Sequence, residues 1–480
     1  MLFLYRKRAT IHQILGDFVR FMIQLRAFDD DGELIADDTI LNLDKGSDRL
    51  EDLGLSLSEG KDILSGLQRP MIEAQLAAYV DRRRCCERCG RSLLIKGSYQ
   101  LLFRTLFGAL SLTSPRFHRC CCQPGESKTF SPLTALLTEH TSPELLYLET
   151  KWASLVSYGM TVDLLKDILP IDRANISTVR RHLNKIAARA EVELDGERPC
   201  SSQGMPDVRQ DESDPVVVGI DGGYVRNWHD KKRRFEAVVG KSIVRHQNDR
   251  YFDLVQTHDH QLKRRVVSVL REQGLSMTDE MTFLTDGADN VRNLALDMSP
   301  SAQHLLDWFH LTMRLTVLIR YTKGLKHYDP KEAAALASRL KRIKWCLWHG
   351  KTDEALRRIR LLARDLGKVD TAYPKMKRFV RKTAELHTYV TNNQSSIPDY
   401  GKRWRQGKRI ATSFVESTVN VLIGKRFVKS QQMQWSKKGA HHLLQTRART
   451  LDGTLHTLFQ KWYPDIAAND QNISNLNLAA

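Results

Sequence analysis

Apolar residues recur at helical spacing along much of this chain, and this spacing predicts its long helices. We expect helices over residues 9–28, about 58–84, 143–192 and 326–410. Residues 193–215, which follow the third of these, are polar and unpatterned and contain Gly, Pro and Ser. Such a composition is typical of a linker, so we expect a domain boundary there.

After residue 215 the pattern changes from helical spacing to strands. Three runs rich in β-branched residues, with short connections, start at Val216, Arg233 and Arg250, and an amphipathic helix then ends at Gly274. The segment "EMTFLTDGADNVRNLALDM" predicts a strand, a turn and a helix. The segment "SAQHLLDWFHLTMRLTVLIRYTKGL" predicts another short strand and a helix, and "ATSFVESTVNVLIGKRF" predicts a further helix.

Two of the expected strands end in an aspartate that glycine follows, Asp221 after "VVVGI" and Asp286 after "MTFLT". A buried ionised carboxylate is costly unless a partner or a metal compensates it, although a strand that simply ends in a turn gives the same pattern. If the strands are neighbours, both carboxylates face one space, where their oxygens suit Mg²⁺ or Mn²⁺. Glu416 is the single acid among twelve basic residues between 401 and 451, so we expect it to be the third ligand.

Charge and hydropathy limit the class of protein. The 480 residues carry a formal charge of +18, an excess that indicates a polyanionic partner such as nucleic acid, or else a merely solvated basic surface. Residues 29–62 hold twelve acids and three bases, and we expect a solvated, partly disordered face there. No apolar run is long enough for a membrane span, and the charged N-terminus does not resemble a secretory signal, so we expect a cytoplasmic protein without a membrane partner.

Six of the eight cysteines fall in two clusters, "RCCERCG" and "HRCCC". In a chain without a secretory signal, such clusters indicate a metal more than disulfides, although surface thiols are the alternative. A β-hairpin predicted around Gly108 would bring the two clusters together, as in a zinc ribbon. The expected structural Zn²⁺ ligands are Cys86, Cys89, Cys120 and Cys122. Three neighbours compete as ligands: Cys85, Cys121 and His118.

A helix, a break at Pro170-Ile171-Asp172 and a second helix have the proportions of a helix-turn-helix, although an ordinary helical hairpin would look alike. The candidate DNA contacts on the second helix are Ser177, Thr178, Arg180, Arg181 and Lys185. Further candidates around Glu416 are Lys408, Arg409, Lys425, Arg426, Lys437 and Lys438. Trp435 is expected in the core, with stacking on an unpaired base as the alternative.

Several motifs together are similar to the DDE transposases of bacterial insertion sequences, specifically the Kra group, which is distantly similar to Mutator-like transposases. They are "GIDGGYV" (219–225), "LTDGADNVR" (284–292), "LLDWFHL" (305–311), "FVESTVN" (414–420) and "MQWSKKGAHHLLQTRAR" (433–449), with the N-terminal "CERCG". The resemblance covers roughly residues 80–455. The acidic segment 29–62 and the C-x-C pair depart from the family pattern.

The resemblance implies an α/β fold: an RNase H-like mixed sheet with an all-α insertion, preceded by a zinc-ribbon-like module and a helical, helix-turn-helix-like domain. It also implies catalysis by Asp221, Asp286 and Glu416 with two Mg²⁺ or Mn²⁺ ions, and leaves Asp307 and His310 in a block of less certain role. The implied activity is cleavage of double-stranded DNA at element ends and strand transfer to target DNA, in a homodimer or larger complex. A nuclease or recombinase without strand transfer and a non-catalytic DNA-binding protein are the alternatives.

The expected order of domains follows from these assignments. The segments are 1–84 (helical, with the acidic stretch), 85–130 (zinc module), 131–192 (helix-turn-helix), 193–215 (linker), 216–325 (first part of the core), 326–410 (helical insertion), 411–455 (second part of the core) and 456–480 (tail).

Overall fold

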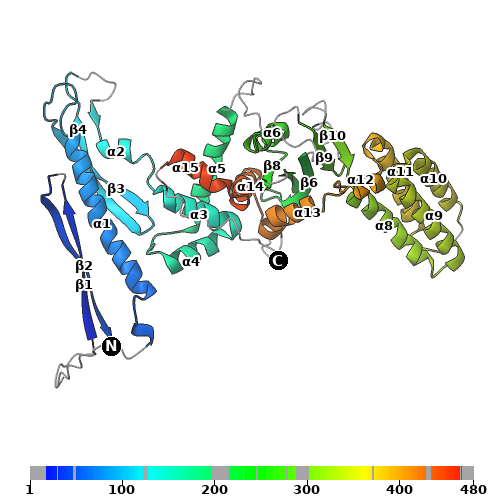
Figure 1. The fold of residues 1–480 in the computed structure, drawn as a ribbon, viewed down its shortest axis with the longest axis horizontal. Helices are drawn as coiled ribbons and strands as arrows, with labels where there is room; N and C mark the ends of the chain where they lie inside the picture. Colours follow the sequence, from blue (N-terminus) through cyan, green and yellow to red (C-terminus); the bar gives the residue numbers. More distant parts are fainter. Residues whose placement is uncertain are drawn as a thin grey trace, which may run out of the picture. The chain divides into compact units, whose positions relative to one another are not determined.

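The structure is a computed structural model, and it is a mixed α/β protein with three separate sheets (Figure 1). One compact unit runs to His182 and also includes residues 459–464 and 466, and the other spans Leu183–Leu458. The described residues are 18–29, 31–46, 50–122, 128–196, 216–230, 232–244, 247–275, 279–287, 294, 302–369, 372–428, 434–464 and 466.

The first unit begins with a two-stranded antiparallel ribbon, β1 (Phe18–Phe28) and β2 (Leu34–Gly46). The expected helix over 9–28 is therefore wrong for residues 18–28, and residues 9–17 lie outside the described chain. The polar residues at 20, 24 and 26 do not by themselves distinguish a helix from a strand. Pairing with the acidic strand β2 favours the strand conformation for this segment. Arg20 lies opposite Asp44 with a 2.8 Å ion pair. The acidic segment is thus partly an ordered strand.

A long helix, α1 (Leu57–Arg82), follows the ribbon, as expected. It starts at a capping box in which Ser56 and Glu59 bond to each other's backbone N–H groups. The expected hairpin forms from β3 (Ile95–Thr105) and β4 (Gly108–His118), which turn at Gly108 with φ +122°. A short third strand, β5 (Thr129–Phe130), pairs with β4.

The helical stretch 143–192 is confirmed as three helices. They are α3 (Pro143–Leu155), α4 (Tyr158–Ile168) and α5 (Ile176–Gly196), and a short α2 (Pro132–Leu136) precedes them. Helix α4 has an N-cap at Ser157 that accepts from the Met160 N–H. Because α5 continues to Gly196, the first four residues of the expected linker are helical, and the remainder, 197–215, lies outside the described residues.

The second unit is built on a five-stranded sheet of order β10-β9-β6-β7-β8. Strands β6 (Val216–Arg226), β7 (Arg234–Ile243) and β8 (Arg250–Val255) form an antiparallel series. Strands β9 (Met281–Thr285) and β10 (Gln303–Leu306) add to β6 in parallel. All five expected strands are present, and the helix expected over 288–299 falls outside the described residues except for Leu294.

Helices cover both faces of this sheet. Helix α6 (Leu262–Glu272) packs on one face, where Val218, Phe283 and Leu270 share a core. On the other face lie α13 (Ser413–Val419) and a π-helical segment, Asn420–Val428, which contact β6, while α14 (Lys437–Leu451) packs on β8. Helix α15 (Thr454–Trp462) follows, so the expected tail from 456 begins within a helix.

A charged cluster holds the last turns of α5 against α6 and α14. Glu191 accepts hydrogen bonds from Arg265, at 2.7 Å, and from His441. Burial alone would raise the pKa of Glu191, but the His441 bond and the Arg265 charge outweigh it and lower this pKa to about 2. The carboxylate is therefore ionised and paired in the folded protein.

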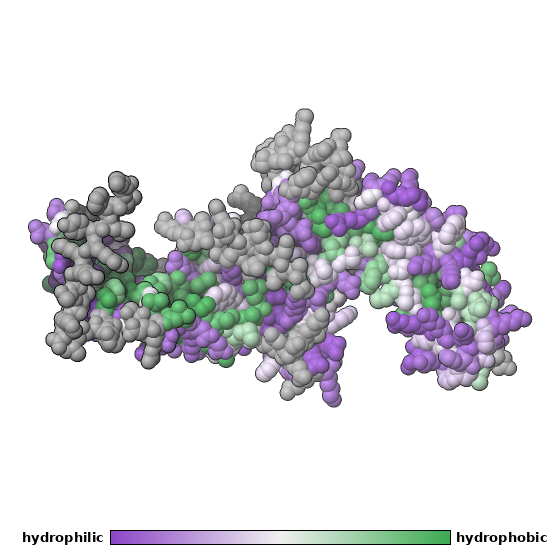
Figure 2. Space-filling model, turned by 60° about the horizontal axis from the view of Figure 1, so that its bottom comes forward, coloured by the Kyte–Doolittle hydropathy of each residue, from purple (hydrophilic) through white to green (hydrophobic). Residues whose placement is uncertain are grey.

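A separate all-helical cluster comprises α8 (Trp308–Leu325), α9 (Pro330–Trp348), α10 (Thr352–Leu366), α11 (Met376–Asn392) and the short α12 (Tyr400–Arg405). They share one core of leucines and aromatic residues. This cluster begins at Trp308, earlier than the expected 326, because the apolar face of α8 packs into that core. Hydrophilic residues cover much of the face of this cluster seen in Figure 2. None of the described helices is both long and apolar enough to cross a membrane.

Candidate active site and cysteine cluster

Three aspartates lie at one level across three adjacent parallel strands, one of them inside β6 and the other two directly after β9 and β10. Strands β6, β9 and β10 are in register at Gly219, Leu284 and Leu305. Since positions two apart along a strand point to the same side, residues two further on share one level at this sheet edge. Those residues are Asp221, Asp286 and Asp307. The sheet thus brings the two expected catalytic aspartates to one edge, and Asp307 with them.

The third expected acid, Glu416, lies exposed on α13. That helix packs directly on β6, because Gly219 leaves room for it: a Cβ at this position would stand 2.7 Å from Phe414 and closer still to Val415. Gly223 makes similar room for the π-helical segment, at 2.7 Å from Ile423. Glu416 therefore lies on a helix that packs against β6, but its own side chain is exposed, and among the described residues the three acids do not form a compact ligand group.

Asp307 is fully buried and has a structural task that the sequence pattern did not reveal. It is the N-cap of α8, where its Oδ1 accepts the Phe309 N–H at 2.7 Å. Its Oδ2 is 2.9 Å from His310 Nδ1 and accepts the Thr412 hydroxyl. One carboxylate thus starts α8, orients His310 and holds the chain just before α13.

The charges at this edge influence one another. Burial raises the pKa of Asp221, the Gly222 N–H and the charge of His310 lower it, and the like charges of Asp286 and Asp307 raise it, so the pKa is raised overall. Burial lowers the pKa of His310, but its bond to Asp307 and the charges of all three aspartates outweigh this and raise it. A cation could offset this repulsion, but among the described residues these acids do not meet as one ligand group.

Sequence reasoning missed several groups beside these acids. The pKa of Glu236 on β7 is raised by burial and by the charges of Asp286 and Asp221. Its signal was an acid inside the apolar run "FEAVV", the same signal that pointed to Asp221. The Tyr389 hydroxyl on α11 donates to the Asp286 backbone carbonyl at 2.7 Å, and the Arg314 guanidinium lies 3.9 Å from its ring centre. No pattern connects α11 to Asp286 in the sequence.

A pocket of about 300 Å³ lies between α8 and α11. Its lining carries charges of both signs, and includes Asp286, His310, Arg314, Lys382, Glu385 and Tyr389. Lys382 pairs with Glu385 at 2.5 Å. The pocket therefore adjoins Asp286 at the acid edge of the sheet.

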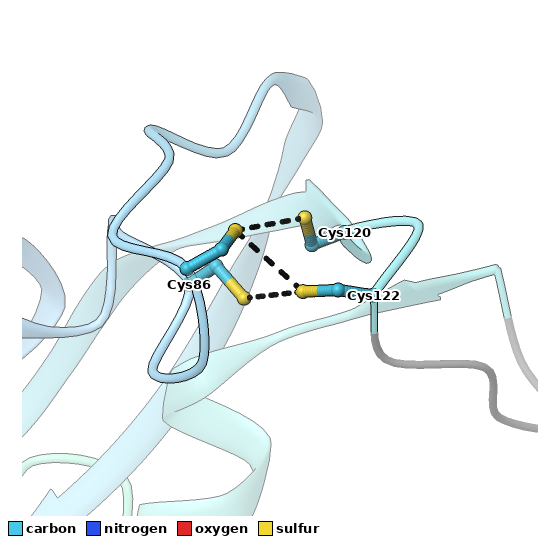
Figure 3. A group of neighbouring side chains, drawn as sticks. Cys86, Cys120 and Cys122 are labelled. Atoms are coloured by element: carbon cyan, nitrogen blue, oxygen red, sulfur yellow. Dashed lines mark hydrogen bonds between the residues drawn. The ribbon is translucent and has the colours of Figure 1, made fainter.

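The predicted cysteine ligands come together in the first unit (Figure 3). The Sγ atoms of Cys86, Cys89, Cys120 and Cys122 all lie within 4.8 Å of one another. Cys86 Sγ is 3.3 Å from Cys122 Sγ, and Cys89 Sγ is 3.5 Å from Cys120 Sγ. The competing Cys85, Cys121 and His118 are exposed and do not join the group. Four thiols at these separations can bind a metal such as zinc.

Local backbone geometry builds this cluster. Gly90 has φ +69° and donates to the Cys86 carbonyl at 2.9 Å, which closes the knuckle after the first pair. The Cys122 backbone N–H lowers the pKa of Cys120 to about 6, whereas the bond from Cys86 raises the pKa of Cys122. The backbone thus already favours a thiolate at Cys120, the form that binds a metal.

Comparisons with known proteins assign no family. No family model and no curated protein matches the chain. The site must therefore be interpreted from its own residues.

Most of the expected DNA-contacting residues are on the surface, and two are not. Thr178 is buried in α5, where its N–H bonds to Asn175 at 2.8 Å. Arg426 is also buried, 5.1 Å from the centre of the Trp435 ring. Neither side chain is therefore accessible to DNA in this structure, because each lies on the buried side of its helical segment, a side that the charge pattern alone does not identify. The exposed ones are Ser177, Arg180, Arg181, Lys185, Lys408, Arg409, Lys425, Lys437 and Lys438.

Trp435 is buried, as the sequence favoured. Its ring packs 4.9 Å from Phe427, and its backbone pairs with the end of β6 through the Trp228 N–H and the Arg226 carbonyl. Stacking of Trp435 on an unpaired base is thereby excluded in this conformation.

Proposed function

We propose that this chain is a DDE-type transposase that binds the ends of its own insertion sequence, cleaves the DNA strand there and transfers it to target DNA. The observation that carries the proposal is the level arrangement of Asp221, inside β6, and Asp286, directly after the neighbouring parallel strand β9, with Glu416 on a helix packed over β6. The order of three antiparallel strands, a helix, two parallel strands, a helical cluster and then the Glu helix supports an RNase H-like core.

In this proposal, one group of residues binds metal ions and another binds DNA. Asp221, Asp286 and Glu416 would hold two divalent cations, which supply Lewis-acid stabilisation of the attacking and leaving oxygens when bound. Asp307 orients His310 beside the two aspartates and fixes the start of α8. The exposed bases near Glu416 hold the phosphate backbone, and this contact makes binding dependent on salt.

The N-terminal unit would recognise the element end. In this proposal the four cysteines bind a structural Zn²⁺, and the exposed face of α5 presents Ser177, Arg180 and Arg181 to the DNA. Recognition would then lie before the linker and chemistry after it, in a dimer or larger complex on two element ends.

The test uses purified chain, Mg²⁺ or Mn²⁺, and labelled duplexes taken from the DNA that flanks its gene. Asp221→Asn, Asp286→Asn and Glu416→Gln should each reduce cleavage by at least ~100-fold while DNA binding persists. Glu354→Gln is the matched control, a helical glutamate paired with Arg357 and Arg358, and it should cleave like the wild type. Activity within ~10-fold of wild type for Asp286→Asn, beside an inactive Asp307→Asn, would overturn the assignment.

The same reactions separate the other activities. Cleavage without joined products would indicate a nuclease, and binding without cleavage in either metal would indicate a non-catalytic DNA-binding protein. Joined products that carry the labelled 3′ end would support the transposase.

A further inference from the structure

We propose that Trp404, on the basic segment Lys402–Arg409, stacks on a nucleotide that has left base pairing in the DNA strand bound at the acid edge. The inference rests on the proposed function only in that the bound strand is the DNA being cut. The inference assigns a role to Trp404 and specifies that the bound DNA contains an unpaired base, neither of which follows from the three acids.

The first observation is the position of this segment. Just before it, the Tyr400 hydroxyl donates to the Leu306 carbonyl at 2.7 Å, at the end of β10. Just after it, the Ile410 carbonyl accepts the Trp308 N–H at 3.1 Å, and Thr412 donates to Asp307. Both ends of the segment are thus tied to residues 306–308, the place where β10 gives way to α8 beside the acids.

The second observation is the rigid base under Trp404. Tyr400 is fully buried, and its ring lies 4.8 Å from Trp308 and 6.4 Å from Trp348. Gly401 is buried against Trp348, where a Cβ would stand 2.6 Å from the indole nitrogen. Helix α12 therefore cannot move freely, and Trp404 is held on a fixed support.

The third observation is the chemistry of the exposed part. Trp404 is 65% exposed, and residues 400–412 contain five bases and no acid. An exposed indole among cations is the combination that binds unpaired nucleic acid, because the ring stacks on a base while the cations neutralise phosphates. In a fully paired duplex the faces of the bases are covered by their neighbours, so this contact requires an unstacked base.

A second exposed tryptophan lies in another basic stretch but away from the acids. Trp228 is 62% exposed in the β6–β7 turn, where Asp230 pairs with Arg233. Nothing ties that turn to residues 306–308 among the described hydrogen bonds. Trp228 therefore serves as the matched control, with the same side chain and similar exposure.

The experiment measures affinity for a labelled single-stranded oligothymidylate of about 12 nucleotides and for a duplex of the same length, at one salt concentration. Trp404→Ala should weaken single-strand binding by about tenfold and duplex binding by less than about twofold, since one stacked base is lost. Trp404→Phe should restore most of the single-strand affinity, and Trp228→Ala should change neither.

Single-strand affinity of Trp404→Ala within about twofold of wild type, or an equal loss on both DNAs, would overturn the inference. A loss of single-strand affinity that Trp404→Phe does not restore would also overturn the inference. Phenylalanine keeps an aromatic ring that can stack on a base, so it should restore most of an affinity that depends on stacking. The cleavage assay on the wild-type protein tests the proposed function independently. Absence of cleavage by the wild type would contradict the proposed function. The affinities of the Trp404 variants for single-stranded DNA test only the role of Trp404.

Discussion

Two aspartates at the sheet edge, Asp307 and Asp221, should respond differently to the same substitution by asparagine. Asp307→Asn removes a fully buried carboxylate that accepts from Phe309, His310 and Thr412. Asparagine can still cap α8 through its oxygen. The two bonds at Oδ2 are lost or reversed, and each hydrogen bond to a charged group contributes about 1.5–3 kcal/mol. Because Thr412 can rotate to accept from the new amide, we expect a net loss of roughly 2–4 kcal/mol in the free energy of unfolding.

Asp221→Asn should have little effect on stability or should increase it slightly. Its carboxylate has a raised pKa because of burial and of the neighbouring aspartates, so removing the charge relieves repulsion. The Oδ1 acceptor for the Gly222 N–H, at 2.8 Å, is retained in asparagine. Folding is thus indifferent to the residue that catalysis is expected to require.

Thermal unfolding of the two variants checks this contrast without any knowledge of the DNA. For a unit of this size about 1 kcal/mol shifts Tm by roughly 2–4 °C, so Asp307→Asn should lower Tm by roughly 5–15 °C. Hydrogen exchange should quicken in the first turn of α8, which loses its support. If Asp307→Asn melts with the wild type, or if Asp221→Asn melts as early as Asp307→Asn, the division into structural and catalytic acids is refuted.

Three further predictions concern other parts of the chain. Cys120→Ser should reduce bound zinc below about half an equivalent, whereas Cys121→Ser, outside the cluster, should keep about one equivalent in reduced, gel-filtered protein; equal zinc in both would contradict the ligand set. Since the Glu191 pKa falls from 4.5 unfolded to about 2 folded, its stabilisation is complete above pH 4.5 and is lost as pH falls from 4.5 toward 2. In Glu191→Gln, the fall in the free energy of unfolding between pH 4.5 and 2, measured by urea titration at several pH values, should be smaller by roughly 2–3 kcal/mol than in the wild type. The same fall in both proteins would contradict this prediction. Replacing Lys408 and Arg409 by Gln should reduce the slope of log affinity against log salt by about 2, provided that both contact phosphates.

Runs of β-branched residues and the acids beside them were enough to predict the five strands and the closeness of Asp221 and Asp286. Each strand there is buried on both faces, so its sequence is a continuous apolar run that only a polar residue of special purpose interrupts, as at Asp221. The cysteine cluster was also predicted, because the ligand spacing and the hairpin turn at Gly108 bring the two pairs together. The spacing alone left Cys85, Cys121 and His118 as competing ligands, and only the fold excludes them from the group.

What could not be predicted depends on partners distant in the sequence. The spacing of apolar residues in β1 predicts a helix. Its strand conformation becomes evident only from its pairing with β2, which includes the ion pairs of Arg20 and Arg26. Arg426 reads as a surface base until the Trp435 ring is placed over it. Asp307 reads as a metal ligand until its three donors are seen. In each case the deciding contact joins residues that no local period links.

Gly219 and Gly223 of β6 bear on which variants of this chain could keep its fold at the acid edge. A variant with alanine at 219 would keep Asp221, Asp286 and Glu416, yet the helix that carries Glu416 could not pack at its present distance from the strand. If the chain is the proposed transposase, gene copies with all three acids but without these glycines would be inactive. Counting intact acid triads would then overestimate the number of active copies.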